Sequence, residues 1–447
     1  MKKRAAIFIP VILLFIAAGY YAFSSFSLFS DEENNNPGVL SGKSENIELT
    51  FWRNYGTKLE NEAYKELIAA FESSHPGITI KMNAIPYGDY ELRLRTEIAA
   101  GSPPDIMSID SPNLALYANS GALLSIDKEM KEEGEIEDIP FSTLEGMKFE
   151  DEIYLSPIAE SGVALFYNID LFKKAGLPFP SDDPASPMTW DEVVEIAKKI
   201  NDPGNEIYGI DPAQGFSDGE SPGYFKTPLL WQYGADVLSP DGKTASGYLN
   251  SKNAVQALQF YQDLYHRYKV ASVDLPPDPF ITGHLGMSVL GSWMLGEIER
   301  NNPDFKLGED FGVAPLPKGN YQVTPNGGWA LGISAKSDHP EEAWKFIRYM
   351  TSFEGSKKYV DITGDMPARF SVLKAFPELT AYPKNIFVQQ ALKYSKNRPV
   401  SPAYPVISDA LKELFEEIGI GGKDIKASAD KAVAKINSGL DDINNKE

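Results

Sequence analysis

The sequence contains no cysteine in its 447 residues. Disulfides, thiolate metal sites, thiol catalysis and lipid attachment through sulfur are therefore excluded for this chain. Histidine is also scarce, and we interpret the four present as turn, cap or surface residues: His75, His266, His284 and His339. No His-Glu-x-x-His pair, phosphate-binding Gly-rich loop or Gly-x-Ser-x-Gly elbow occurs. The sequence thus offers no metal site, no cofactor site and no identifiable catalytic residue.

Positive charge is also in short supply. The chain has 42 lysines and arginines against 63 aspartates and glutamates, which gives a net charge of -21. Such a surface repels phosphate backbones, so nucleic acid is not an expected partner. Hydrophobic residues make up 43% of the chain and aromatic residues 12%, which is typical of a folded protein. At this length we expect at least two lobes with large cores.

The N-terminal segment has the pattern of an export signal. Residues 2–4 are basic, residues 5–29 carry no charge, and acidic residues follow from Asp31. About 20 apolar residues span a bilayer, so residues 1–29 are either a cleaved signal peptide or a retained membrane anchor. Their length and a poor match to an Ala-x-Ala cleavage site favour the anchor. We expect residues 30–46 to be a flexible linker, and the protein to act outside the cytoplasm at the outer face of the cell membrane.

After the linker, hydrophobic periodicity changes repeatedly between strand and helix spacing. Apolar residues alternate with polar ones over 47–51, recur at helical spacing over 59–71, and alternate again over 78–82. A helix ending at Gly101 and a strand over 106–109 continue the series. Strand, helix, strand units of this kind build parallel sheets. The sequence therefore predicts an α/β fold.

Three later helices have recognisable starts. Thr189 and Glu192 have the spacing of a capping box, in which a hydroxyl and a carboxylate satisfy free amides at the helix start. Another helix is predicted after Ser251, and a third has Pro340 in its first turn. These signals are structural and carry no chemistry.

The tryptophans point to a ligand site. Four of the six lie near predicted strand ends or Gly-rich turns: Trp52, which is expected to close the first strand, Trp231, Trp293 and Trp329. Ligands of open parallel sheets bind in the crevice beyond the strand ends, and an indole face matches the apolar face of a pyranose ring. Interior packing is the alternative for each of them. Trp190 and Trp344 lie within helical patterns and are predicted to be core residues.

Eight segments resemble, in the same order, motifs of the extracellular solute-binding proteins of family 1. These are the sugar-binding components of ABC importers, to which maltose-binding protein also belongs. The segments are FESSHPGITI from Phe71, AAGSPPDI from Ala99, ALFYNIDLFKKAGL from Ala164, MTWDEV from Met188, GHLGMSVLGSW from Gly283, GGWALGIS from Gly327, HPEEAWKFIRYM from His339 and GDMPAR from Gly364. The chain departs from the usual Gram-positive pattern in lacking the lipidated cysteine, which leaves its mode of anchoring open.

The resemblance implies a two-lobed periplasmic-binding-protein-like fold that closes on its ligand by hinge motion. Lobe 1 would comprise residues 47–156 and 317–369, and lobe 2 residues 157–316 and 370–447. Hinge strands would then lie near 155–157, 315–317 and Arg369. Prolines at 157, 315 and 317 would limit where the hinge bends, because proline fixes φ.

The resemblance also implies the ligand contacts. The expected binding residues are Trp52, Asn54, Tyr87, Asp110, Glu160, Tyr167, Trp231, Trp293, Gly328, Trp329 and Arg369. Glu160 and Asp110 would accept hydrogen bonds from sugar hydroxyls, while Arg369 could equally be a salt-bridge residue.

The function that the resemblance implies is capture of a mono- or oligosaccharide outside the cell and delivery to an ABC permease. The protein would be a monomer, without cofactor, metal or enzymatic reaction. Two alternatives stay open. One is a secreted polysaccharide-degrading enzyme, since 63 acidic residues could hide the carboxylate pair of glycoside hydrolysis. The other is a binding protein of the same fold for a non-sugar solute such as a polyamine.

Overall fold

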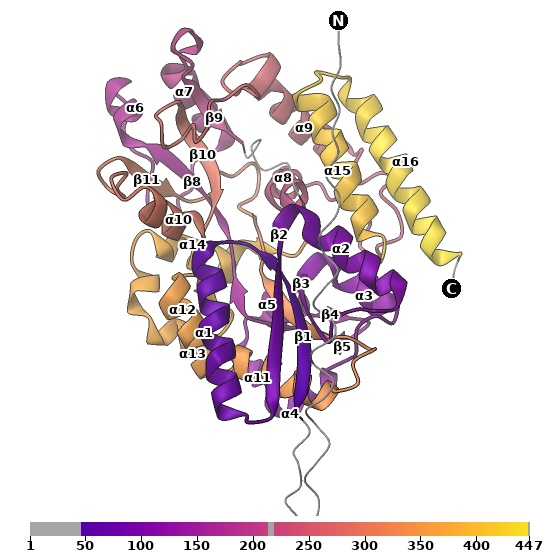
Figure 1. Cartoon of the computed structure of the whole chain (residues 1–447). Coiled ribbons are helices and arrows are strands. Elements are labelled where there is room, and N and C mark those ends of the chain that lie inside the picture. Colours follow the sequence, from indigo (N-terminus) through magenta and orange to yellow (C-terminus); the bar gives the residue numbers. More distant parts are fainter. Residues whose placement is uncertain (1–45, 213–218, 446–447) are drawn as a thin grey trace, which may run out of the picture. The chain divides into compact units, whose positions relative to one another are not determined.

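The computed structural model describes residues 46–212 and 219–445 (Figure 1). The predicted signal or anchor at 1–29 lies outside the described residues, as does the predicted linker up to residue 45. The chain divides into two units, residues 1–44 and 45–447, and every described element belongs to the second. In the described ranges, no helix is both long and apolar enough to cross a membrane.

The first sheet has five strands in the order β2-β1-β3-β13-β6. β1 pairs in parallel with β2 and β3, whereas β13 is antiparallel to β3 and β6. The chain therefore returns to this sheet late, and its return places Trp329 opposite Asp110. The strands are β1 (Ile47–Tyr55), β2 (Ile78–Pro86), β3 (Ile106–Asp110), β6 (Ser156–Pro157) and β13 (Trp329–Ile333).

Helices α1 (Lys58–Ser74) and α2 (Tyr87–Ala100) connect the parallel strands of this sheet, and α1 lies alongside β1 and β2 in Figure 1. α1 begins at a capping box: the Glu60 amide donates to the Thr57 hydroxyl over 3.1 Å, and the Thr57 amide donates to the Glu60 carboxylate over 3.2 Å. α2 ends at Gly101, whose φ of 77° favours glycine. The predicted strand, helix, strand unit is thus confirmed.

The second sheet has four strands in the order β11-β8-β10-β9. Its strands are β8 (Val163–Asn168), β9 (Tyr208–Asp211), β10 (Leu285–Gly291) and β11 (Phe311–Ala314). Five helices connect or follow its strands in the chain: α6 (Ile169–Lys174), α7 (Trp190–Ile200), α8 (Ser221–Gln232), α9 (Lys252–His266) and α10 (Met294–Asn301). The last two helices of the chain are α15 (Tyr404–Gly419) and α16 (Ile425–Asn444). α15 and α16 lie side by side (Figure 1). The predicted capping box of α7 is confirmed, with Thr189 and Glu192 each accepting from the other's amide.

The remaining helices are α3 (Leu114–Asn119), α4 (Asp127–Glu133), α5 (Phe141–Glu145), α11 (Pro340–Thr351), α12 (Phe353–Thr363), α13 (Phe370–Ala375) and α14 (Lys384–Tyr394). Short strand pairs are β4 (Lys148–Phe149) with β5 (Glu152–Ile153), β7 (Ala159–Glu160) with β14 (Met366–Pro367), and β12 (Thr324–Pro325) with β15 (Ser395–Lys396).

Two hydrophobic clusters form the core. One gathers around the first sheet and includes Phe51 and Leu331, and the other gathers around α7, α8, α9 and α15 and includes Leu414. Trp344 belongs to the first and Trp190 to the second, with 8% and 6% of their surfaces exposed. Both are core residues, as predicted.

Two local predictions are wrong. Trp52 does not close the first strand, because β1 continues to Tyr55. Trp231 does not lie at a strand end or turn, because it is the penultimate residue of α8 and only 3% exposed. α8 contains Pro228 and is buried along nearly its whole length, so its sequence lacks the polar face by which an amphipathic helix is recognised.

Candidate functional site

A cavity of about 310 Å³ lies where β1, β3, β7 and β13 meet α8 and α10. This volume is at the lower end of the range typical of small-molecule sites. Of the residues predicted from the sequence, those that line the cavity are Asn54, Tyr87, Asp110, Glu160, Trp293, Gly328 and Trp329. Other residues that line it include Thr57, Glu60, Tyr64, Ser161, Ser221, Tyr224, Phe225, Ser292, Tyr359, Asp365 and Arg398.

Trp329 contributes an aromatic wall from the first residue of β13. Its ring makes T-shaped contacts with two tyrosines of α2, at centroid distances of 6.2 Å to Tyr87 and 5.8 Å to Tyr90. Gly328 before it has a φ of 144°, and a Cβ there would lie 2.4 Å from the Ala159 carbonyl oxygen. Only glycine fits this turn, so the backbone fixes where the indole begins.

Trp293 contributes a second aromatic wall from the N-cap of α10. Its ring centroid lies 6.2 Å from Tyr224 and 6.1 Å from Phe225, both in α8. A Cβ on Gly291 would come within 2.3 Å of this ring, so the indole lies directly against the glycine backbone. Trp293 and Trp329 both keep part of their surface exposed, and both line the cavity.

Arg398 is the centre of a buried polar network. Its guanidinium donates to Asp110 at the end of β3 over 2.7 Å and to Glu220, the N-cap of α8, over 3.0 Å. Glu220 also accepts from the Tyr404 hydroxyl and, over 2.6 Å, from Ser408. Burial raises the pKa of Glu220, and the neighbouring Arg398 opposes that shift. Removing one partner would leave a buried charge without compensation.

A hydrogen bond from the Glu220 amide to the Tyr87 hydroxyl, over 3.1 Å, lies beside this network. Tyr87 belongs to α2 and Glu220 precedes α8, so the bond joins a helix of the first sheet to the helix that carries the second aromatic wall. Together with Arg398, it couples the two groups of elements that line the cavity.

Glu160 in β7 is a buried carboxyl, with 7% of its surface exposed. One of its oxygens, Oε2, has no hydrogen-bond partner. Burial raises the pKa of Glu160 to about 8. The Oδ1 of Asn54, a residue only 2% exposed, is likewise without a hydrogen-bond partner. Both residues line the cavity, and although the two unpartnered oxygens are buried, a ligand that donates hydrogen bonds would satisfy them.

Two more acidic residues line the cavity near α1 and α12: Glu60, which lies in α1, and Asp365, which follows α12. Arg53 forms a 2.8 Å ion pair with Glu60 and lies 4.1 Å above the Tyr64 ring. Asp365 accepts a 3.2 Å hydrogen bond from the Tyr359 hydroxyl. Burial raises the pKa of Asp365 to about 7.

Three other residues predicted to bind ligand do not line the cavity and instead contact neighbouring side chains. Trp52 packs against the first hydrophobic cluster. Tyr167 packs on Phe172, at a centroid distance of 5.3 Å. Trp231 donates from its indole to Asp236 over 3.2 Å. None of these three is among the residues that line the cavity.

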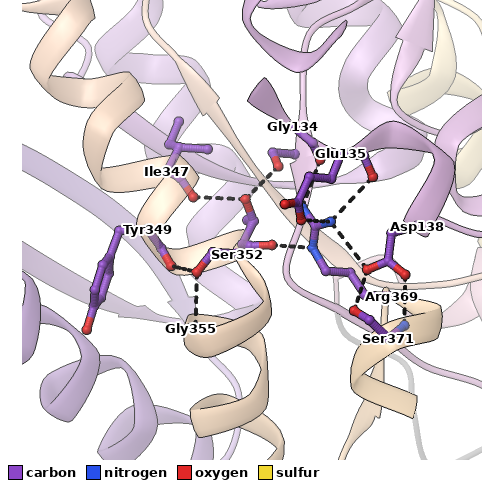
Figure 2. A network of polar contacts seen from close by, with 11 residues as sticks. Gly134, Glu135, Asp138, Ile347, Tyr349, Ser352, Gly355, Arg369 and Ser371 are labelled. Carbon is purple, nitrogen blue, oxygen red and sulfur yellow. Dashed lines mark hydrogen bonds and ion pairs between the residues drawn. The ribbon is translucent and has the colours of Figure 1, made fainter. Parts of the chain in front are cut away.

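Arg369 does not line the cavity either. Figure 2 shows its side chain in a network of polar contacts with Gly134, Glu135 and Asp138. Arg369 donates to the carbonyl oxygens of Thr351 and Gly134, the latter over 2.9 Å, and forms ion pairs with Glu135 at 3.4 Å and Asp138 at 3.6 Å. This is the salt-bridge alternative recognised in the sequence.

Sequence reasoning missed several residues of the cavity, above all Arg398, Tyr224 and Asp365. Arg398 lies in the loop between β15 and α15, 288 positions along the chain from its partner Asp110. No local pattern marks such a residue, because only the tertiary fold brings it to Asp110. In the described residues, no group of three or more His, Cys, Asp or Glu side chains could hold a metal ion.

Comparisons with known proteins agree with this architecture. Residues 56–357 match the family model described as bacterial extracellular solute-binding protein. A maltotriose-binding protein of Pyrococcus abyssi is 25% identical over 380 residues, which cover 83% of this chain and 77% of that protein. A solute-binding protein from Thermotoga lettingae, solved with bound alpha-D-tagatose, is similar with a TM-score of 0.78 and 28% identity, over 88% of this chain and 100% of that one. An sn-glycerol-3-phosphate-binding periplasmic protein of Rhizobium meliloti is 26% identical, over 88% of this chain and 94% of that protein.

Proposed function

Because the chain belongs to the bacterial extracellular solute-binding proteins, we propose that it captures a carbohydrate in the 310 Å³ cavity and delivers it to an ABC-type permease. Capture takes place outside the cytoplasm, at the outer face of the membrane. The protein acts as a monomer and performs no reaction on the sugar.

The observation that carries this proposal is the combination of two aromatic walls with unpartnered hydrogen-bond acceptors. Trp293 and Trp329 line the same cavity and keep part of their surface exposed. Each offers a flat apolar face to a sugar ring. Asn54 and Glu160 carry oxygens without partners, which sugar hydroxyls would satisfy. A saccharide offers both kinds of surface at once.

The names of two relatives support the ligand class. One is named for maltotriose and the other was solved with tagatose, and both resemble this chain over most of its length. The relative named for sn-glycerol-3-phosphate marks the competing ligand class. Among the described residues that line the cavity, the one arginine is Arg398, and it is already bound by Asp110 and Glu220, which disfavours a phosphate as ligand.

We further propose that the cavity closes by motion of two lobes, 47–156 with 317–369 and 157–316 with 370–447. The chain passes between the two sheets from β6 to β8 and again from β11 to β13, at the predicted hinges near 155–157 and 315–317. Because strands within a sheet are held rigidly by their hydrogen bonds, bending would concentrate in the segments between β6 and β8 and between β11 and β13.

Calorimetric titration of the purified protein with a panel of oligosaccharides tests the proposed function. We expect saturable, reversible heat, and chromatography of the recovered ligand should show it intact. A shortened saccharide would instead indicate a polysaccharide-degrading enzyme. Absence of binding to every sugar, with binding of a polyamine or glycerol phosphate, would assign the fold to a non-sugar solute.

A further inference from the structure

The charge of the cavity is strongly one-sided. Among the described residues, four acidic residues line it, Glu60, Asp110, Glu160 and Asp365, against one arginine, Arg398. Two of these carboxyls have cationic partners: Glu60 pairs with Arg53, and Asp110 pairs with Arg398. Arg398 also pairs with Glu220, so two carboxylates share its charge, and only its Nε has no hydrogen-bond partner.

The other two carboxyls, Glu160 and Asp365, form no ion pair with any described residue. Glu160 is 7% exposed and its Oε2 has no hydrogen-bond partner. The groups that influence it are the Thr143 hydroxyl and the amides of Ser161 and Gly327, none of which carries charge. A buried carboxyl without a cation remains protonated or finds a cation, because an isolated charge is costly away from water.

Asp365 faces a mixed environment. Burial and the neighbouring Glu60 raise its pKa, while the Tyr359 hydroxyl and Lys384 oppose that shift. Lys384 donates to the Gly364 carbonyl oxygen over 3.1 Å, and it is not among the residues that line the cavity. The ammonium group that acts on Asp365 is therefore bound to a backbone carbonyl and does not line the cavity.

We propose that the cavity selects saccharides by charge, preferring a sugar with a protonated amine to its neutral counterpart and the neutral sugar to one bearing phosphate or carboxylate, with Glu160 and Asp365 setting the preference. This inference rests on the proposed carbohydrate-binding function. An ammonium group satisfies an unpartnered carboxylate both as a charge and as a hydrogen-bond donor. A phosphate or carboxylate brings a negative charge that opposes the ionisation of these two carboxyls, and Arg398 is already paired with two carboxylates. The partly exposed indoles of Trp293 and Trp329 also favour a cation near their faces.

The test uses matched sugars of one stereochemistry. Full-length protein is titrated with glucose, mannose and galactose, and with the amino sugar, the uronic acid and the sugar phosphate of each. In the series that binds, we expect the amino sugar to bind about tenfold more tightly than the neutral hexose, and both anionic forms to bind about tenfold more weakly. Near pH 6, about one unit or more below the pKa values of Glu160 and Asp365, binding of the amino sugar should release protons, measured as a dependence of heat on the buffer. The neutral sugar should release none.

Charge-removing variants locate the selectivity. Glu160→Gln and Asp365→Asn should each reduce the ratio of amino-sugar to neutral-sugar affinity by severalfold and lower the proton release. Glu91→Gln is the matched control, because Glu91 also has a pKa raised by burial, to about 7, but does not line the cavity. It should leave the ratio unchanged. Two independent variants keep the test informative if one of them fails to fold.

Tighter binding of the anionic sugars would overturn the charge selection while leaving carbohydrate capture intact. The charge selection would also be overturned if neither Glu160→Gln nor Asp365→Asn changed the ratio of amino-sugar to neutral-sugar affinity. If no sugar of any charge binds here or in the oligosaccharide panel, the proposed function itself is wrong and the inference falls with it.

Discussion

Trp293 and Trp329 are the residues whose removal should weaken carbohydrate binding most. Each Trp→Ala change removes an apolar face worth up to about 2 to 4 kcal/mol at ~25 cal/mol per Å², or roughly two orders of magnitude in affinity. Stability should change less, since both indoles are only partly buried. Binding isotherms and denaturant midpoints measure the two effects.

The matched controls are Trp190→Ala and Trp344→Ala. These residues are 6% and 8% exposed, and loss of such a core side chain typically costs about 3 to 5 kcal/mol of folding stability. If Trp293→Ala and Trp329→Ala unfold easily while binding sugar normally, both residues belong to the packing interior.

Glu160 should make stability depend on pH. Burial raises its pKa from 4.5 to about 8 in the folded protein, so the folded state holds a proton that the unfolded state releases. Stability from this proton is fully present below about pH 4.5 and is lost as pH rises through about 8. Glu160→Gln should therefore flatten the fall in unfolding free energy between about pH 5 and pH 8, measured by denaturant titration.

The control for this pH effect is Glu195→Gln, at an exposed position of α7. It should retain the pH slope of the unaltered protein. An unchanged slope in Glu160→Gln would mean that Glu160 is ionised in the folded state.

At the scale of single elements, α7 depends on its cap. The Thr189 hydroxyl accepts from the Glu192 amide and the Glu192 carboxylate accepts from the Thr189 amide over 2.7 Å. Thr189→Ala should cost about 1 kcal/mol of stability. Thr96→Ala, at an exposed position within α2, should cost less, because no helix start depends on it. Equal denaturant midpoints for the two variants would contradict a stabilising role for the cap.

Elements with a clear period or cap could be predicted from the sequence, whereas elements made by tertiary contacts could not. β1, α1 and β2 each expose one face and bury another, so their periodicity is visible. α8 is buried along nearly its whole length and contains Pro228, and its sequence resembles a turn. β13 is antiparallel to β3, a pairing that periodicity cannot reveal.

The same distinction applies to the site. Gly328 and Trp329 stand in a Gly-Gly turn before a strand, a local signal that marked them in advance. Arg398 has no such signal, because the residue that it binds, Asp110, is 288 positions away in the chain. Tyr167 belongs to a recognisable motif and Trp231 was expected near a turn, but their rings pack into the interior.

At the scale of the whole molecule, Arg398 links the end of β3 to the start of α8. Arg398→Ala would leave Asp110 and Glu220 buried without their cation, and we expect a loss of about 3 to 5 kcal/mol in unfolding free energy, with weaker sugar binding. Arg267→Ala is the control, since the Arg267 side chain is 70% exposed and pairs with Asp263 within α9. It should cost less than about 1 kcal/mol. Similar thermal midpoints for the two variants would show that the buried network does not stabilise the fold.

A crystal structure of the protein with the saccharide that binds best in titration tests the central claim most directly. The proposed function predicts that sugar rings lie against the indoles of Trp293 and Trp329, with hydroxyls within hydrogen-bond distance of Asn54 and Glu160. The ligand would fill the cavity bounded by β3, β13, α8 and α10. A saccharide bound elsewhere on the chain, or one in the cavity that touches neither indole, would contradict it.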